Sequence, residues 1–405
     1  MDKKTVSKIS FTGDIMCERP FINAAKKRGM GFSGFLDPCK ELFAKSDLVV
    51  GNLETPCDPD SPLSKDMFIF NAPVSFVSAI KESGIDFVTT ATNHCLDRGL
   101  TGLKSTIRTL DQVGLEHTGT FDDRGQDRFK VVDLPDGTRV AVVSYTYGTN
   151  YLDNKVLIEP EDYYSINYLT PLYGGRNKAT DNMSYSLRSR LTRAIPRGLR
   201  TRVNAMLGRQ IKAAFTDCLQ DGDLGESEIA SICDTIEKAH KAADLVAVCP
   251  HFGGQFNLKH GTYVDAFVDL FDKAGADLII GNHPHVVQQY ETAGSGMKIA
   301  YSLGNVSMSL STPYIELKDL PECSVMLHAY IQNKKICKMS FSVLVEKEDR
   351  GFISVYPLAA LYENSSEQYR KELQVKNNII YNRFTGCEGK VVPVDEEYDL
   401  WELSE

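Results

Sequence analysis

Histidines and carboxylates that could hold a metal ion follow apolar runs at several places in this 405-residue chain. The clearest case is Gly281-Asn282-His283-Pro284-His285, which comes directly after Ala276-Asp277-Leu278-Ile279-Ile280. An apolar run that ends in a glycine is typical of a buried strand reaching the edge of a sheet. Two histidines at i and i+2 can direct both imidazoles into one space, and neutral imidazole is the commonest protein ligand for divalent transition metals.

Four further strand ends carry residues of the same kind. They are Gly13-Asp14, Gly51-Asn52-Leu53-Glu54, Thr92-Asn93-His94 and Cys249-Pro250-His251. Ligands bind outside the carboxyl ends of strands in open α/β sheets, so we expect the five segments to meet in one place. Any one of them could be an ordinary structural loop, but the five together favour a metal centre.

The composition narrows the class of protein. A net charge of −9 argues against binding to nucleic acid, because phosphate backbones are bound by basic surfaces. There is neither an apolar run of about eighteen residues nor an apolar signal region at the N-terminus, so we expect a cytoplasmic protein, peripheral to a membrane at most. The ten cysteines form no C-x-x-C pair, which indicates reduced thiols. Cys17, Cys95 and Cys249 lie beside the proposed ligands, either as ligands or as small apolar side chains beneath the loops.

Strands and helices alternate around the proposed ligands. Helices are expected over residues 20–29, 35–45, 73–82, 97–113, 226–242 and 262–274, and strands over 129–133, 139–145, 244–250, 276–281, 297–303, 324–332 and 335–345. Asp136-Gly137 indicates a hairpin turn. This order is typical of two sheets flanked by helices. We expect one domain over 1–345, interrupted by an insertion at 151–225, and a C-terminal extension over 346–405.

The core of the insertion is strongly basic. Residues 176–212 hold ten Lys or Arg against one acid, Asp181, and an apolar stripe at helical spacing predicts at least one amphipathic helix. The helix could simply dock on the domain and leave its arginines in water. Alternatively it could form a lid, with Arg197 and Arg200 contacting an anionic substrate, or bind an anionic membrane surface.

The motifs, taken in order, resemble those of CapA-type capsule-synthesis proteins, which are associated with poly-γ-glutamate and belong to the calcineurin-like metallophosphatase superfamily. The most specific segments are residues 52–56, 91–99, 117–119 and 275–288, and residues 301–305 follow them in the family's order. The resemblance covers about residues 6–150 and 226–310. It implies a four-layer α-β-β-α sandwich that holds two divalent ions, which could be Mn, Zn or Fe.

The resemblance also implies roles for individual residues. Asp14, Glu54, Asn93, His251, His283 and His285 correspond to metal ligands, with Glu54 bridging the two ions. His94 corresponds to an acid or anion-stabilising group beside them. Residues 144–150 resemble a loop that borders the site, where Asn150 could contact substrate, although they could also be a plain turn from a strand into the insertion.

The chain departs from the phosphatase pattern in two places. The usual histidine two residues after the first aspartate is Met16 here, so the first ion is expected to bind weakly or to use Cys17 or Glu18. The bridging acid is also a glutamate in place of the usual aspartate.

Two functions remain open at this level. The first is a metal-dependent hydrolase or transferase that acts on an anionic polymer or phosphoester in capsule or cell-envelope polymer metabolism. The second is a catalytically silent binding or assembly protein that keeps the fold within a capsule-synthesis machinery and contacts its other proteins.

Overall fold

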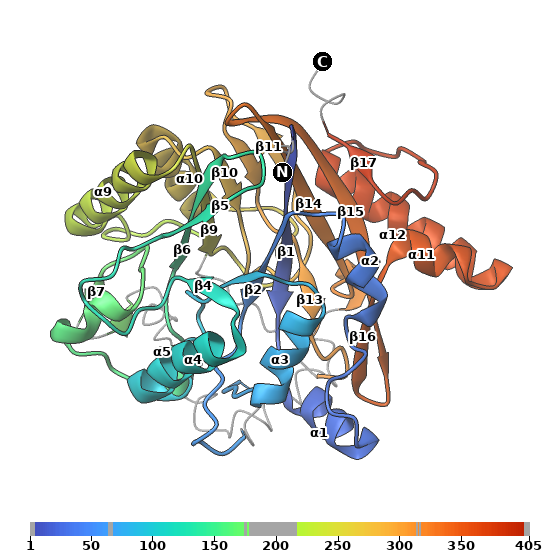
Figure 1. Cartoon of the computed structure of the whole chain (residues 1–405), viewed down its shortest axis with the longest axis horizontal. Helices are drawn as coiled ribbons and strands as arrows, with labels where there is room; N and C mark the ends of the chain where they lie inside the picture. Colours follow the sequence, from blue (N-terminus) through green and yellow to red (C-terminus); the bar gives the residue numbers. More distant parts are fainter. Residues whose placement is uncertain are drawn as a thin grey trace, which may run out of the picture.

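Two β-sheets lie face to face with helices on their outer sides, and Figure 1 shows this arrangement. The computed structural model describes residues 5–63, 68–173, 176–177, 217–312, 315 and 317–400. The four-layer α-β-β-α sandwich expected from the sequence is confirmed. Within the described residues, no helix combines the length and the apolar character needed to cross a membrane.

The first sheet mixes a parallel half with an antiparallel half. The parallel half contains β1 (Ser7–Ile15), β2 (Leu48–Leu53), β3 (Phe87–Thr89) and β4 (Glu116–Thr118), and the antiparallel half contains β14 (Cys323–Gln332), β15 (Lys335–Asp349) and β16 (Phe352–Pro357). The two halves join where β1 pairs with β14. Two short strands, β13 (Asn305–Ser307) and β17 (Tyr398–Asp399), pair with β1 and β15.

The second sheet has a parallel centre. Its order is β11 (Tyr290–Thr292), β12 (Lys298–Ala300), β10 (Leu278–Ile280), β9 (Leu245–His251), β6 (Arg139–Thr146) and β5 (Lys130–Asp133). The expected Asp136-Gly137 hairpin joins β5 to β6. Because β6, β9 and β10 are parallel, as are β1, β2 and β3, the carboxyl ends of each set lie at one edge of their sheet.

Both faces of the central strands are buried, which explains their continuous apolar sequences. On β2, Leu48 and Val50 face the core between the sheets, whereas Val49 faces the outer helices. The outer helices of the first sheet are α1 (Arg19–Arg28), α3 (Val74–Glu82) and α4 (Gly99–Val113), and those of the second are α9 (Glu226–Ala242) and α10 (Thr262–Ala274). Gly114 and Gly275, both with positive φ, end α4 and α10.

The helix expected over residues 35–45 is shorter than predicted. The chain forms a 3₁₀ turn, η1 (Asp37–Cys39), followed by α2 (Lys40–Phe43). Pro38 disfavours helical backbone angles in the residue before it and has no N–H to donate, so a helix can begin only at this point.

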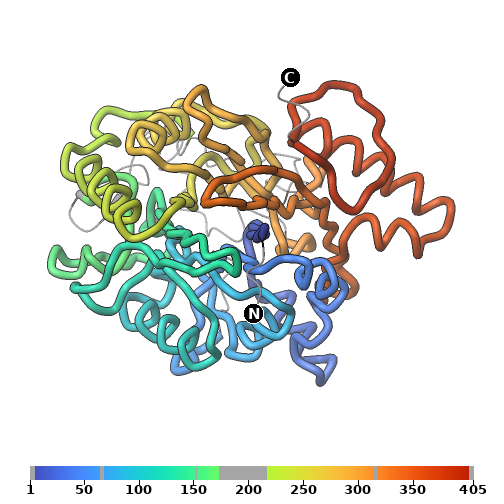
Figure 2. Tube along the Cα trace, turned by 45° about the horizontal axis from the view of Figure 1, so that its top comes forward, coloured from blue at the N-terminus to red at the C-terminus, as the bar shows by residue number. Residues whose placement is uncertain are grey.

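The C-terminal residues belong to the main fold. The boundary expected at residue 345 was wrong, since it falls inside β15, and β16 extends the first sheet beyond it. After β16 come α11 (Leu358–Glu363) and α12 (Glu367–Thr385). Phe384 of α12 packs on Phe341 and on Tyr290 of β11, so α12 continues the layer of the second sheet beyond its edge. Figure 2 shows this segment at the end of the molecule opposite α9.

The insertion is described only at its two ends. These ends contain α5 (Tyr151–Asn154), the 3₁₀ helix η2 (Pro160–Ser165) and the strands β7 (Leu172–Tyr173) and β8 (Arg176–Asn177). A further 3₁₀ turn, η3 (Leu317–Asp319), precedes β14. Most of the basic stretch, with Arg197 and Arg200, lies outside the described residues.

Candidate metal centre

The five strand ends meet at one edge of the two sheets. Asp14 lies near the end of β1, Glu54 directly follows β2 and Asn93 lies in the loop after β3. From the second sheet, His251 ends β9, while His283 and His285 follow β10. All six side chains are buried. The structure therefore brings together the six residues that the resemblance assigned as metal ligands.

Glu54 lies at the centre of this group. Its Oε1 atom is 3.3 Å from His251 Nε2, 3.7 Å from His285 Nε2 and 4.0 Å from His94 Nε2. Glu54 is fully buried, yet neither of its carboxylate oxygens accepts a hydrogen bond from any described residue. An ionised carboxylate buried in this way is costly unless a cation binds it.

The remaining donor atoms face the same space. His251 Nε2 lies 2.9 Å from Asn93 Oδ1 and 3.2 Å from His283 Nδ1. The Nε2 atom of His283 is also buried without a partner among the described residues. Two sets of side chains converge closely enough to hold an ion, namely Glu54 with His283 and His285, and Glu54 with Asp14 and His251. This buried Asp, Glu and His cluster could bind metal.

Asp14 holds the histidine loops in place. Its Oδ2 atom accepts a hydrogen bond from the backbone N–H of His283 (3.1 Å) and lies 3.1 Å from His285 Nδ1. Its Oδ1 atom accepts a hydrogen bond from Asn52 Nδ2 (2.7 Å), and this amide also lies 3.2 Å from His251 Nδ1. Asp14 is therefore linked to all three histidines of the cluster.

The loop that carries His283 and His285 has an unusual backbone. His283 has φ +98° and His285 has φ +58°, and a non-glycine residue at such angles carries about 1–3 kcal/mol of strain. Gly281 lets the start of this loop pass close to Tyr301, because a Cβ at residue 281 would lie 2.0 Å from the carbonyl oxygen of Tyr301. Asn305 fixes the end of the loop, with Oδ1 2.9 Å from His285 Nδ1 and Nδ2 donating to the carbonyl of His285.

The surroundings of His283 and His285 shift the pKa values of these two histidines in opposite directions. Burial alone would lower the pKa of His285, but Glu54 and Asp14 outweigh it and raise that pKa to about 9. Burial and the neighbouring His251 and His285 hold the pKa of His283 well below its ordinary value. Burial opposes ionisation of Asp14, but His285 outweighs it and the pKa of Asp14 is lowered. The cluster thus keeps an anionic centre that attracts positive charge.

His94 lies at the rim of the cluster and is paired with the carboxylate of Asp97. Its Nδ1 atom lies 2.7 Å from Asp97 Oδ2, which also accepts a hydrogen bond from the backbone N–H of Phe70. Burial alone would lower the pKa of His94, but the Asp97 carboxylate outweighs it and the pKa is raised. On the other side of the ring, Asn150 Nδ2 lies 3.4 Å from His94 Nε2. Asn150, expected to contact substrate, is thus beside His94.

Met16 does not take part in the cluster. Its side chain packs with Phe70, Phe256, Val286 and Met308 in a separate apolar group. The loop after β1 also turns its other donors away, since Cys17 packs in the core under the outer helices and Glu18 accepts hydrogen bonds from Ser309 and Thr312. These contacts explain why neither Cys17 nor Glu18 supplements the ligands as expected.

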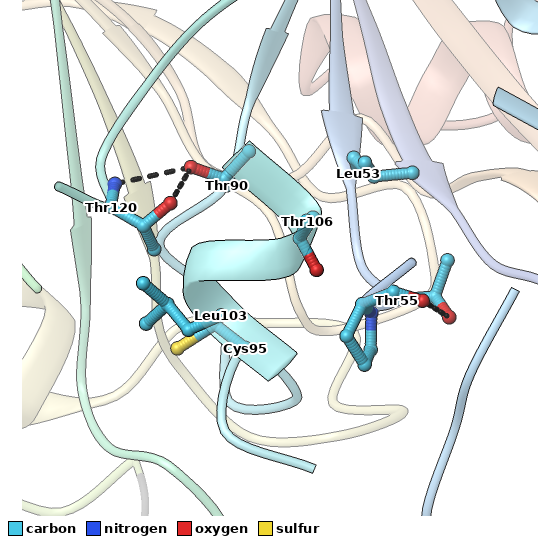
Figure 3. A pocket seen from close by; sticks show the side chains of 8 residues that line it. Leu53, Thr55, Thr90, Cys95, Leu103, Thr106 and Thr120 are labelled. Carbon is cyan, nitrogen blue, oxygen red and sulfur yellow. Dashed lines mark hydrogen bonds between the residues drawn. The ribbon is translucent and has the colours of Figure 1, made fainter. Parts of the chain in front are cut away.

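The remaining cysteines near the centre are packing residues. Cys249 lies in the core between the sheets. Cys95 lines a cavity of about 10 Å³, and Figure 3 shows it beside Leu103, with the hydrogen-bonded pair Thr90 and Thr120 also in the lining. Burial raises the pKa of the Cys95 thiol. A protonated thiol is a poor metal ligand.

Three supporting residues were missed from the sequence. Asn52, Asp97 and Asn305 each hold a histidine or carboxylate of the centre in position. Each stands inside one of the family-like motifs of the sequence, so its polar side chain near a strand end was the available signal. The partner of each side chain could not be predicted, because most of these contacts join segments that are far apart in the sequence.

Comparison with known proteins gives curated relatives of similar sequence. Capsule biosynthesis protein CapA of Bacillus anthracis is 25% identical over 301 residues, which cover 73% of this chain and 58% of that protein. PGA biosynthesis protein CapA of Bacillus subtilis (strain 168) is 23% identical over 308 residues, which cover 73% of this chain and 62% of that protein. The matches thus span about three fifths of the length of these relatives.

One similar solved structure is described as a novel phosphatase from Mycoplasma pneumoniae. It has 14% sequence identity and a TM-score of 0.38, over 85% of this chain and 96% of that chain. This degree of similarity supports no inference about function.

The family comparison covers most of the chain. The family described as "Bacterial capsule synthesis protein PGA_cap" matches residues 8–309, a range that contains Asp14, Glu54, Asn93 and all three histidines of the cluster. The match agrees with the resemblance seen in the motifs, and its extent shows that this chain belongs to the bacterial capsule synthesis protein family PGA_cap.

Proposed function

We propose that this chain is a metal-dependent hydrolase or transferase that acts on an anionic polymer or phosphoester in capsule or cell-envelope polymer metabolism. The observation that carries the proposal is Glu54, a fully buried carboxylate that accepts no hydrogen bond from the described residues and faces three imidazoles. Mixed carboxylate, amide and imidazole donors suit Mn, Zn or Fe. The chemistry supplied by such an ion is polarisation of a phosphoryl or carbonyl oxygen and activation of water.

His94 is suited to act as the general acid. The raised pKa of His94 favours the protonated ring near neutral pH, where it can donate a proton to a leaving oxygen or nitrogen. Asp97 positions the ring through Nδ1 and leaves Nε2 directed towards Glu54 and Asn150. Asn150 can donate a hydrogen bond from its amide to a substrate oxygen at the same rim.

The choice of an anionic substrate rests on two observations. The relatives are named as capsule and PGA biosynthesis proteins, and residues 176–212 hold ten basic residues against one acid. A basic segment draws anionic polymers or anionic membrane surfaces towards a protein. Replacing Arg197 and Arg200 with Gln should therefore weaken binding of poly-γ-glutamate in a salt-dependent manner, whereas sedimentation with anionic vesicles tests the membrane alternative.

The activity is tested with the full chain loaded with Mn²⁺. Hydrolysis of p-nitrophenyl phosphoesters and cleavage of poly-γ-glutamate are measured for the wild type and for Glu54→Gln, His94→Gln and His240→Gln. We expect Glu54→Gln to abolish turnover and His94→Gln to lower it by about 10²–10⁴-fold. His240, which is exposed on α9, is the matched histidine control and should keep full activity. A wild-type protein that binds no ion after loading would contradict the proposal.

A second candidate function is a binding or assembly protein without catalysis. Met16 favours this candidate, because an apolar side chain stands where phosphatases of the superfamily carry a ligand. The two functions are separated in cells that depend on this chain for capsule. If His94→Gln and His283→Ala both support wild-type amounts of polymer, the assembly function is correct. Loss of polymer with normal protein levels supports catalysis.

A further inference from the structure

The donor atoms of the cluster are distributed unevenly. Glu54 Oε1, His251 Nε2 and His285 Nε2 face one another, and Asn93 Oδ1 lies 2.9 Å from the same His251 nitrogen. Glu54, His283 and His285 also converge as a set. One space is therefore surrounded by a carboxylate, an amide oxygen and imidazoles, which is a sufficient ligand set for one divalent ion.

Asp14 is the one donor that would define a second position, and its oxygens already have other contacts. Oδ1 accepts a hydrogen bond from Asn52, while Oδ2 accepts one from the backbone of His283 and faces His285 Nδ1. The contact with His285 leaves the other nitrogen of that ring directed to Glu54. A carboxylate that holds a histidine by one nitrogen while the other binds metal is a common supporting arrangement.

A second ion would have to share Glu54 with the first ion. The set formed by Asp14, Glu54 and His251 shares Glu54 with the first set, and His251 presents its Nε2 atom to Glu54 and Asn93. In the described part of the loop after β1, Met16 packs into its apolar group. Its backbone is fixed as well, because Met16 and Ser307 exchange hydrogen bonds. Moving Met16 to admit a ligand would break both the packing and these bonds.

We infer that this chain binds one divalent ion, not two, with Glu54, Asn93 and the three histidines around it and Asp14 as a positioning residue that does not touch the ion. The inference rests on the metal dependence proposed above and concerns the number of ions. Asp14 orients His285 through Nδ1, fixes the His283 backbone and reaches His251 through Asn52.

The test is the metal content of the full chain after loading with excess Mn²⁺ and removal of unbound metal. We expect one ion per chain by native mass spectrometry, and an electron paramagnetic resonance spectrum of isolated Mn²⁺. Two ions per chain, or the spectrum of an exchange-coupled pair, would overturn the inference and leave the proposed function standing. No bound ion would instead overturn both.

Two isosteric variants separate a ligand from a positioning residue. Glu54→Gln should lose the ion, whereas Asp14→Asn should still bind one ion with affinity lowered by about 10–100-fold. If Asp14→Asn loses the ion as completely as Glu54→Gln while its circular dichroism stays native, Asp14 is a ligand and the inference is wrong. Should Asp14→Asn fail to fold, the wild-type metal content still decides.

Discussion

Asp97 raises the pKa of His94 against the effect of burial and so favours the protonated ring. Its carboxylate lies 2.7 Å from His94 Nδ1 and accepts a hydrogen bond from the Phe70 backbone, so its position is fixed by the chain. The ring of Phe70 lies against His94 with centroids 4.2 Å apart and limits water on that side. A histidine held this way is suited to donate a proton at neutral pH.

We expect Asp97→Asn to move the alkaline limb of the activity profile to lower pH. The carboxylate is what raises the pKa of His94 against burial, so its removal lets burial dominate and the pKa falls. The protonated acid then disappears at a lower pH, and kcat at neutral pH drops. The measurement is kcat against pH for the wild type and the variant.

Another histidine–aspartate pair provides the control for this experiment. His117 Nε2 lies 3.2 Å from Asp111 Oδ1, away from the centre. Asp111→Asn should leave the profile unchanged. An Asp97→Asn enzyme with a wild-type profile would show that His94 is not the titrating acid.

The buried carboxyl of Glu346 lowers the stability of the folded protein at neutral pH. One of its oxygens accepts a hydrogen bond from the backbone N–H of Met308, and the other has no partner among the described residues. Burial, and to a lesser extent the charge of Glu18, raise the pKa of Glu346 well above its ordinary value of 4.5. A carboxyl whose pKa is raised by folding makes the folded protein less stable as pH rises above 4.5, because the unfolded chain releases the proton first.

Glu346→Gln should therefore increase the free energy of unfolding at neutral pH, by about 1 kcal/mol or more. The amide keeps an acceptor for Met308 and carries no charge. The gain should shrink as pH falls towards 4.5, the ordinary pKa of the carboxyl. Urea unfolding at both pH values checks this. Asp349→Asn is the control, since Asp349 is 92% exposed on the same strand. A less stable Glu346→Gln protein would contradict the expected cost.

At the scale of elements, the junction between β1 and the loop before β13 depends on glycine. A Cβ at Gly13 would lie 1.9 Å from the carbonyl oxygen of Gly304, so β1 can pass close to the loop before β13 only with glycine there. Asp14 follows directly, and its backbone N–H donates to the same Gly304 carbonyl (2.9 Å). The close approach therefore positions one carboxylate of the centre.

Gly13→Ala should destabilise the protein by about 1–3 kcal/mol, because backbone must shift to admit the methyl group. Gly294→Ala is the control, since a Cβ there has no atom within 4 Å and the position lies in an ordinary backbone region. Thermal unfolding of both variants gives the comparison. Equal melting temperatures would show that the loop before β13 shifts at no cost and that close packing does not require glycine at residue 13.

The helices and strands with strong periodicity were predictable from the sequence. Residues 226–242 and 262–274 have the expected bounds because their apolar stripes and flanking glycines agree. The face that α12 buries is partly polar and includes Asn377. Its sequence alone therefore resembles a solvated helix. Only the pairing of Phe384 with Phe341 and Tyr290 reveals that it completes the core.

The residues of the candidate site were predictable from the sequence, but the hydrogen bonds that connect them were less so. Strand-end residue types indicated which side chains meet, because parallel strands bring their ends to one edge. The links through Asn52 and Asn305 depend on register between distant strands, which no local pattern encodes. Met16 was correctly singled out as unusual, but its apolar partners come from separate loops.

At the scale of the whole molecule, a row of polar side chains ties the N-terminal strand to the C-terminal segment. Ser10 Oγ on β1 lies 2.7 Å from His328 Nδ1 on β14, and His328 Nε2 lies 3.0 Å from Ser342 Oγ on β15. Ser342 in turn donates to the carbonyl of Glu396. Next to this row, the Glu397 carboxylate pairs with Lys8 at 2.9 Å. Strand β1 and the segment after α12 are thus joined across the first sheet.

This row should make the fold sensitive to acid. Burial and the nearby Lys8 lower the pKa of His328 from 6.5 to about 3. The stability it contributes is fully present above pH 6.5 and is lost as pH falls towards 3, because the unfolded chain takes up a proton that the folded chain refuses. Glu397, whose pKa is lowered from 4.5 to about 2 despite burial, mainly by Ser340 and Lys8, adds a second loss below 4.5.

We therefore expect His328→Gln to flatten the dependence of unfolding free energy on pH. Between the two pKa values of His328 the wild-type slope should exceed that of the variant by about 1.4 kcal/mol per pH unit, the value for one proton. Urea unfolding across that interval measures the slopes, and subtraction removes the contribution of His283 and the other histidines common to both proteins. His240→Gln is the matched control and should keep the wild-type slope. Parallel curves for the wild type and His328→Gln would mean that His328 takes up its proton without unfolding, so that the row of serines around it tolerates the charged ring.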